Sequence, residues 1–448
     1  MAERSEAVEE QAVRDASAAY KVAADIETTE DVPPGYKRTD VGVIPKAWSV
    51  KVLGEVLKKG RLGGNYQNGN VPSGLPLMKM GNLDRGSFNT SKIEFIPSEE
   101  HIEEQHKLRY GDVLFNTRNT LELVGKVAIW RNELPIAYYN SNLMRLEFNR
   151  DNVVSNEYAN YALNTEGSIE RLGALATGTT SVAAIYTRDL LGLPFIVPPP
   201  AEQRAIATAL SDADALIKSL YRLIAKKRAI KQAAMQQLLT GQTRLARFTG
   251  EWQTKRLGEF VSIRDEKVMP SAVHPETACI ELEHIGKGDG RLVTHSMAKY
   301  STSSKYQFRA GDVLFGRLRS YLRKYWLAKH GGICTTEIWP LVIDANKAVS
   351  GFLLGIVQSK RFTGAASVSY GTHMPRADWK VLENFEVKLP KIEEQAAIAT
   401  VLSNMDTEIG ALERRREKAR QIKQGMMQQL LTGRVRLVEE NREDASYG

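Results

Sequence analysis

The sequence lacks the features of a membrane or secreted protein. Its longest apolar runs, such as Phe352–Val357, are far shorter than the roughly 20 residues needed to span a bilayer, and no signal-peptide pattern is present. Cysteine is scarce: only Cys279 and Cys334 occur, too few for a disulfide scaffold or a cysteine-rich metal site. These absences predict a cytoplasmic protein with no membrane partner.

Catalytic signatures are also missing. No G-x-x-x-x-G-K-[ST] phosphate loop occurs, since Gly125-Lys126 lacks the upstream glycine, and the seven histidines are scattered without metal-ligand spacing. Neither an Asn/Asp-Pro-Pro-aromatic methyltransferase motif nor a glycine-rich cofactor loop is found. Asp378 with Glu386–Lys388 is a nuclease-like string, but alternating apolar residues favour a strand there. We expect no catalytic, cofactor-binding or metal site on this chain.

Acidic charge is low in the body of the chain. The net charge is +8, but residues 1–34 hold nine acids against three bases, and residues 438–448 hold four against one. Without these terminal stretches, residues 35–437 carry +17. A body this basic favours a polyanionic partner such as DNA. Residues 1–34 are expected to form an acidic arm, either a frayed helix or a disordered segment.

An internal repeat dominates the sequence. Residues 198–245 recur as residues 390–437 at a constant offset of 192, without a gap, and 27 of the 48 positions are identical. Both copies predict a helix, because each begins with proline and has a glycine, Gly241 or Gly433, where a C-terminal cap is needed. Ser211 and Ser403 could each cap a second helix, so the pattern fits one continuous helix or two.

The repeated helices carry a narrow apolar seam with alternating spacings of four and three. A helix of about 25–40 residues spans roughly 40–60 Å. Because such a seam is too narrow to be buried alone, we expect the two copies to pack on each other. The seam consists of Ile206, Leu210, Ala213, Ile217, Leu220 and Ile224 in the first copy, and Ile398, Leu402, Met405, Ile409 and Leu412 in the second.

Two globular α/β or α+β regions precede the two helices. They echo each other more faintly than the helices do: Gly111–Phe115 recurs as Gly311–Phe315, and the loops between such shared segments differ. This is typical of one fold that carries two binding surfaces. The expected boundaries are an arm at 1–34, a first domain at 35–197, a central helix at 198–242, a second domain at 243–388, a distal helix at 389–434 and a tail at 435–448.

These features together resemble the specificity (S) subunit of type I restriction–modification enzymes. The resemblance covers about residues 35–437. It rests on the repeated P-x-x-x-E-Q-x-x-I-x-x-x-L-S-x-x-D-x-x-I and Q-Q-L-L-T-G segments, on two G-D-V-L-F units, and on R-L-x-x-F-x-G-E-W after the first helix. The acidic arm has no counterpart in that family that we can assign.

The resemblance implies two target-recognition domains joined by two long helices that form an antiparallel coiled coil with an internal pseudo-two-fold repeat. In that family each domain reads one half of a split double-stranded DNA target, and the helices set the spacing. Two DNA methyltransferase (modification) subunits bind the helices and carry S-adenosylmethionine, and restriction/translocase subunits use ATP and Mg. This chain would itself hold no cofactor.

Base-reading residues should be polar loop residues: Arg or Lys contact guanine, and Asn or Gln contact adenine. Loops 63–68 and 116–120 fit in the first domain, and loop 176–181 suits phosphate contacts. In the second domain the matching loops are 317–324 and 370–376. The predicted DNA-binding residues are Asn65, Tyr66, Gln67, Asn68, Arg118, Asn119, Thr120, Thr179, Thr180, Arg317, Arg319, Arg323, Lys324, Thr372, His373 and Arg376.

Alternatives remain open at this point. Each loop residue alone could equally belong to a solvated surface, and the basic runs 226–231 and 414–423 fit a solvated helix face or a site for acidic partner helices better than a phosphate site. The whole chain could instead serve a smaller system that cuts on both sides of its site. A standalone DNA-binding regulator or coiled-coil scaffold is a further alternative, and an enzyme in its own right is disfavoured by the missing motifs.

Overall fold

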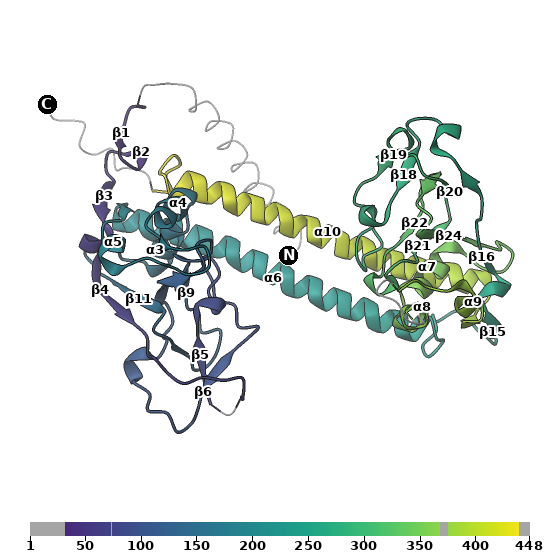
Figure 1. Cartoon of the computed structure of the whole chain (residues 1–448), viewed down its shortest axis with the longest axis horizontal. Helices are drawn as coiled ribbons and strands as arrows, with labels where there is room; N and C mark the ends of the chain where they lie inside the picture. The colour runs from purple at the N-terminus through teal and green to yellow at the C-terminus, as the bar shows by residue number, and fades with distance from the viewer. Residues whose placement is uncertain (1–31, 73, 368–374, 439–448) are drawn as a thin grey trace. The chain divides into compact units, whose positions relative to one another are not determined.

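The computed structural model describes residues 32–72, 74–367 and 375–438. The chain forms two compact units (Figure 1). The first unit comprises residues 1–218 and 417–448, and the second comprises residues 219–416. Most of the predicted acidic arm and C-terminal tail lies outside the described residues.

The first unit is built around a four-stranded antiparallel sheet in the order β4-β11-β7-β9. The predicted Gly111–Phe115 motif supplies strand β7, whose four residues are all buried. Helix α3 (Asn156–Leu163) packs against β9 and is followed by α4 (Glu166–Ala174). The sheet strands are β4 (Leu57–Leu62), β11 (Leu143–Phe148), β7 (Val113–Asn116) and β9 (Val127–Ile129).

Smaller sheets and short helices complete the first unit. Strand β1 (Tyr36–Thr39) pairs with β2 (Gly42–Pro45), and β3 (Ser49–Val52) pairs with β14 (Pro194–Val197). The remaining elements are α2 (Leu53–Val56), β5 (Leu75–Met78), β6 (Glu94–Ile96), β8 (Arg118–Asn119), β10 (Tyr138–Tyr139), β12 (Thr177–Gly178), β13 (Ala183–Ala184) and α5 (Thr187–Leu191).

The second unit repeats the central sheet in the order β16-β24-β21-β22. The second copy of the motif, Gly311–Phe315, again supplies the buried strand β21. Beside it lies a five-stranded sheet, β17-β20-β23-β18-β19. The central strands are β16 (Val261–Ile263), β24 (Ile338–Ile343), β21 (Val313–Gly316) and β22 (Tyr325–Leu327); the other five are β17 (Lys267–Val268), β20 (Lys305–Phe308), β23 (Gly332–Cys334), β18 (Ala278–Ile280) and β19 (Ser296–Met297).

Helices α7 (Ser350–Gln358), α8 (Lys360–Ala366) and α9 (Trp379–Leu382) accompany the second unit's sheets, and β15 (Gln253–Arg256) pairs with β25 (Glu386–Leu389). Glu386–Lys388 of the nuclease-like string therefore lie in a strand, as their alternation predicts. Asp378 caps helix α9, because its side chain accepts a hydrogen bond from the Lys380 N–H.

The repeated segments form two continuous helices, α6 (Pro200–Leu238) and α10 (Ile392–Leu430), of 39 residues each. Ser211 and Ser403 lie inside these helices and begin no second helix. Gly241 and Gly433 follow the helix ends with φ of +72° and +71°, the left-handed conformation that a helix C-terminus favours.

In the first unit, the N-terminal half of α6 packs antiparallel to the C-terminal half of α10. Near the start of α6, Glu202 pairs with Arg436, which follows the end of α10. Twelve residues further along α6, Asp214 pairs with Lys423 at 2.6 Å. As the residue number along α6 increases, the residue number of its partner in or after α10 decreases, which establishes that the two helices run antiparallel.

The second unit repeats this pairing with the partners exchanged. Glu394 of α10 pairs with Arg244 at 2.6 Å, and Asp406 of α10 pairs with Lys231 of α6 at 2.6 Å. Each of these residues is the 192-residue counterpart of one in the first unit. The basic run at 226–231 thus faces acids of α10: Lys227 pairs with Glu408, and Arg228 pairs with Glu413.

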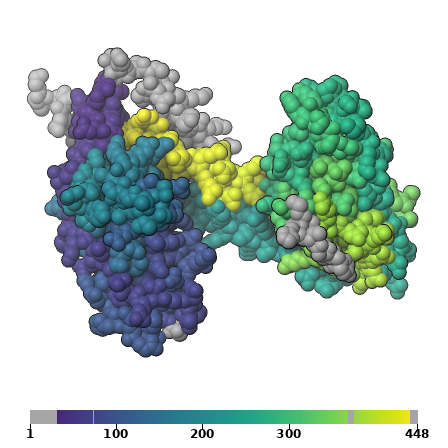
Figure 2. Space-filling view, viewed as in Figure 1, coloured from purple at the N-terminus to yellow at the C-terminus, as the bar shows by residue number. Residues whose placement is uncertain are grey.

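Residues of the apolar helix seam pack into the cores of the two units. Ile206 and Leu210 belong to the core of the first unit, and Ile398 and Leu402 belong to the core of the second. These four seam residues are therefore covered within their own units, and Figure 2 shows another part of α10 at the surface, in yellow. Of the other seam residues, Leu220, Ile224 and Ile409 are buried, and Ala213, Ile217, Met405 and Leu412 are partly buried.

Candidate nucleic-acid interface

In the first unit, the loop after β7 and the hairpin at 177–184 come together. Strand β13 lies between β8 and β12, so that Ala183 pairs with Asn119 on one side and with Gly178 on the other. The N–H of Leu121 also donates to the carbonyl of Thr180 at 3.2 Å. Two of the predicted loops therefore form one polar surface, although about 60 residues separate them in sequence.

Side chains of this surface are held by local hydrogen bonds. The Asn119 carboxamide accepts from the Thr120 N–H at 2.9 Å, and Arg118 is exposed. Gly178 has a φ of +134°, and a Cβ there would lie 2.3 Å from the Val182 carbonyl, so the hairpin requires glycine. Thr179 and Thr180 are exposed at its tip.

Loop 63–68 lies closer to the core than its sequence indicates. A Cβ on Gly63 would lie 2.2 Å from the Tyr139 carbonyl oxygen, so the loop runs tightly along the chain at 139–143. Tyr66 is 9% exposed, and its hydroxyl lies 2.6 Å from Nδ1 of His106. Burial raises the pKa of Tyr66 and lowers that of His106. The Tyr66 side chain thus supports the loop from inside.

The neighbours of Tyr66 face solvent. Asn65, Gln67 and Asn68 are exposed. The Asn68 carboxamide donates to the Tyr66 carbonyl at 2.9 Å and accepts from Lys79 at 3.0 Å. Asn65 and Gln67 are accordingly the residues of this loop whose amides are best placed for an external partner.

In the second unit, loop 317–324 is held in place by hydrogen bonds from its own basic side chains to backbone carbonyls. Arg323 donates to the Gln358 carbonyl at 2.7 Å, and the Lys324 ammonium donates to the Leu282 carbonyl. Burial lowers the pKa of Lys324. Arg319 and Arg323 have φ of +51° and +53°, a conformation costly for residues other than glycine. The loop is therefore held at Arg323 and Lys324, and Arg319 remains exposed on it.

Two further predicted arginines have partners within the second unit. The Arg317 guanidinium lies 4.9 Å from the centre of the Trp339 ring. Arg376 forms a two-pronged ion pair with Glu337, with a shortest contact of 2.9 Å, and this hydrogen bonding lowers the pKa of Glu337. Thr372 and His373 lie outside the described residues.

Tyr321 is a candidate contact residue that the polar-loop argument missed. It is 55% exposed and lies between Arg319 and Arg323 on this anchored loop. A large aromatic side chain held at the surface beside a cation is suited to stacking on a base or packing against a thymine methyl group. The signal in the sequence was an aromatic residue inside the basic run 317–324.

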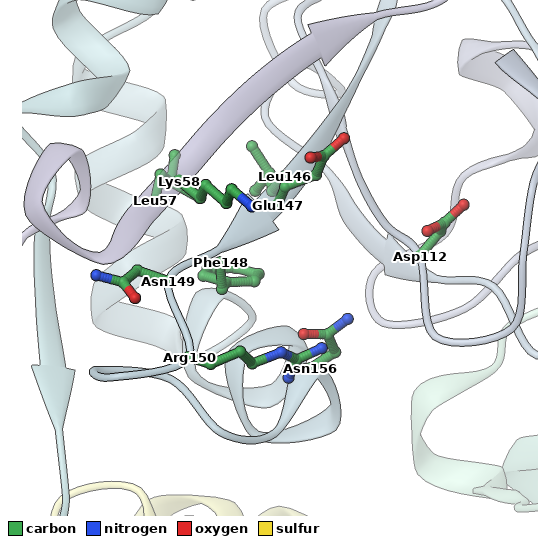
Figure 3. A pocket seen from close by; sticks show the side chains of 9 residues that line it. All are labelled: Leu57, Lys58, Asp112, Leu146, Glu147, Phe148, Asn149, Arg150 and Asn156. Carbon is green, nitrogen blue, oxygen red and sulfur yellow. The ribbon is translucent and has the colours of Figure 1, made fainter. Parts of the chain in front are cut away.

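The first unit also has a hollow of about 620 Å³ beside β4 and β11 (Figure 3). Lys58 and Arg150 lie on opposite sides of Phe148 in this hollow (Figure 3). Its acids are paired: Asp112 and Glu147 contact Arg145 at 3.2 and 3.4 Å. Burial raises the pKa of Asp112. These ion pairs are typical of structural carboxylates rather than catalytic ones.

Within the described part of the chain, no cluster of three or more His, Cys, Asp or Glu residues could hold a metal ion. No described helix is long and apolar enough to cross a membrane.

Comparisons with known proteins point to one family. Residues 45–226 and 249–422 each match the model of the type I restriction modification DNA specificity domain. A putative type I restriction enzyme MjaX specificity subunit of Methanocaldococcus jannaschii is 23% identical over 428 residues, which cover 90% of this chain and 97% of the relative. The MjaVIII specificity subunit of the same organism is 23% identical over 418 residues, covering 88% and 94%.

Solved structures share the fold. The S subunit of a type I restriction-modification system from M. genitalium superposes with a TM-score of 0.56 at 14% identity and covers 90% of this chain and 98% of its own. A chain from a structural study of complex assembly in a type I R-M system gives a TM-score of 0.51 at 18% identity, covering 88% and 99%.

Proposed function

Because this chain belongs to the family of type I restriction modification DNA specificity proteins, we propose that it is the DNA-reading subunit of a type I restriction–modification complex. The observation that carries this proposal is the double match of the family model, once in each half of the chain. Two copies of a recognition domain in one chain are suited to reading a target in two parts. The +17 charge of residues 35–437 favours a DNA partner.

Each unit would read one half of a bipartite target through its own loops. In the first unit the readers are Arg118 and Asn119, with Thr179 and Thr180 contacting phosphates. In the second unit the reader is Arg319, and Tyr321 adds an apolar contact. Arginine suits guanine and asparagine suits adenine, because each can form two parallel hydrogen bonds to the base edge. Arg323 and Lys324 would act by holding the loop.

Catalysis would belong to partner subunits. Two DNA methyltransferase subunits, which carry S-adenosylmethionine, would dock on the outer faces of α6 and α10, and these helices would set the spacing of the half-sites. Restriction subunits would add ATP- and Mg-dependent translocation and cleavage. The chain described here would serve the complex as its recognition component, without a cofactor of its own.

The test is to sequence the methylome of the host with and without this gene. We expect one bipartite methylated motif to disappear in the deletion strain and to return when the gene is restored. Loss of no motif, or methylation of DNA by the purified chain alone, would refute the proposal. A standalone DNA-binding regulator would change transcription and leave the methylome intact.

A further inference from the structure

Helices α3 and α7 occupy equivalent places in the two units. Thr165 caps α4 and Ser359 caps α8, each by accepting a hydrogen bond from the N–H three residues further on. These equivalent caps are 194 residues apart. With this offset, the counterpart of Tyr161 on α3 is Gly355 on α7. The first unit therefore has a tyrosine where the second has no side chain.

Tyr161 is bound by polar groups of α6. Its side chain is 2% exposed, its hydroxyl donates to Oδ2 of Asp214 at 2.8 Å, and the Ser211 hydroxyl lies at 3.3 Å. The Lys423 ammonium is 5.3 Å from the centre of the ring, within cation–π range. Burial raises the pKa of Tyr161, which keeps the hydroxyl protonated as a donor.

The second unit has the same polar groups but lacks the tyrosine. At the offset of 192 the counterparts of Ser211, Asp214 and Lys423 are Ser403, Asp406 and Lys231, identical residues in each case. Asp406 and Lys231 are paired at 2.6 Å, as Asp214 and Lys423 are. Opposite them, at Gly355, is an open hollow of about 300 Å³ between α7 and α10.

The walls of this hollow match the surroundings of Tyr161. Leu402 and Asp406 line it from α10, and Gly351, Leu354 and Gly355 line it from α7. Leu402 is the counterpart of Leu210, which shares a core cluster with Tyr161 in the first unit. The hollow thus combines apolar walls with Asp406, an acceptor for a phenolic hydroxyl. Lys231 reaches the hollow through its partners, because it pairs with Asp406 and donates to the Gln358 side chain at 2.7 Å, and both of these residues line the hollow.

We propose that this hollow receives a tyrosine side chain from a partner protein, the methyltransferase subunit. This identification of the partner rests on the function proposed above. The hydroxyl would donate to Asp406, as Tyr161 donates to Asp214, and the ring would pack against Leu402 near Lys231. A phenylalanine would leave the acceptor unused, and the internal template is itself a protein side chain. Gly355 contributes no side chain of its own to the hollow that it lines.

The first experiment uses 4-fluorophenol as a probe of the full-length chain, followed by fluorine NMR. We expect saturable binding, and binding of fluorobenzene about tenfold weaker because it lacks the hydroxyl donor. Gly355→Tyr should abolish probe binding, since the chain then supplies its own phenol. A Cβ at Gly355 would lie 3.2 Å from side-chain atoms of Leu239 and Leu402, so these two leucines have to give way by a few tenths of an ångström at the Cβ itself.

The matched control is Gly364→Tyr, on α8 of the same unit, where an added Cβ meets no atom within 4 Å. This variant should bind the probe as the unmodified chain does. If Gly355→Tyr does not fold, Ser403→Trp blocks the hollow from its exposed wall instead. Absence of probe binding to the unmodified chain, or equal binding to Gly355→Tyr, overturns the proposal and leaves the proposed function untouched.

The second experiment measures assembly with the co-expressed methyltransferase subunit by quantitative pull-down. Blocking the hollow should weaken assembly about tenfold or more, as loss of a buried aromatic anchor does, whereas Gly364→Tyr should assemble normally. Normal assembly of the blocked variant shows that the hollow binds phenols only, which overturns the partner assignment. Failure of the unmodified chain to assemble with any methyltransferase refutes the proposed function itself and the partner assignment with it.

Discussion

Gln395 and its counterpart Gln203 allow a quantitative test of the two-unit design. Gln395 is fully buried; its amide donates to the carbonyls of Lys347 and Pro390, both at 2.9 Å, and its oxygen accepts from the Val349 N–H at 3.1 Å. One side chain thus joins the start of α10 to the segment before α7. The same three bonds occur at Gln203 in the first unit, with lengths of 2.8 to 3.0 Å.

Gln395→Ala removes all three bonds, of which the one to the Pro390 carbonyl is buried and the ones to the Lys347 carbonyl and from the Val349 N–H are partly buried. Each unsatisfied buried group costs about 1–3 kcal/mol. Partial relaxation and entry of water lower the sum, so we expect the second unit to lose about 3–5 kcal/mol of local stability. Because Gln203 lies in the other unit and shares no partner with Gln395, the two losses should be independent and additive.

Hydrogen–deuterium exchange followed by mass spectrometry resolves this loss by unit, which a single melting curve of a two-unit chain does not. Gln395→Ala should speed exchange in peptides around Val349 and leave the first unit unchanged, and Gln203→Ala should do the converse. Gln395→Glu is a matched variant of similar size. Its carboxylate still accepts from the Val349 N–H but cannot donate to the two carbonyls, so it should also reduce protection in the second unit. Unchanged protection in Gln395→Glu, or equal losses in both units from either alanine variant, would refute the reasoning.

Three further predictions concern DNA. Replacing Arg118 and Asn119 by alanine should relax specificity at one half-site only, and Arg319→Ala should relax specificity at the other. Each lost bidentate contact should cost about 1–3 kcal/mol of discrimination between bases. Methylome sequencing distinguishes this change from an equal loss of specificity at both half-sites. Affinity for DNA should fall steeply with salt if phosphate contacts dominate, and a filter-binding series with constant affinity would contradict this. Four residues inserted between Ile230 and Gln237 add roughly 6 Å of helix, which should alter the gap between half-sites; retained methylation at an unchanged gap argues against helices that set the spacing.

The local pattern of the sequence was sufficient to predict the repeated architecture. The 192-residue repeat and its apolar seam predict the two helices, and the repeated Gly-Asp-Val-Leu-Phe segments, which mark the two related regions, form the buried strands β7 and β21. The resemblance to type I specificity subunits is confirmed by the family match, and the mixed helix–strand fold class is confirmed with it. The repeat, the seam and the family motifs are defined by residue spacing along the chain, which can be read from the sequence without a structure. The continuity of each helix past Ser211 and Ser403 was left open, because a serine suits a cap and is also tolerated within a packed helix.

Which polar side chains are available to a partner was decided only by the tertiary structure. Tyr66 turns into the core to meet His106, Arg323 is held by the Gln358 carbonyl, and Arg376 is paired with Glu337, each across 35 or more residues of chain. The sequence of a loop shows which hydrogen-bond donors it contains. It does not show which distant acceptors bind them, because folding alone brings these acceptors close to the loop. For the same reason the open hollow at Gly355 is visible only when α7 lies against α10.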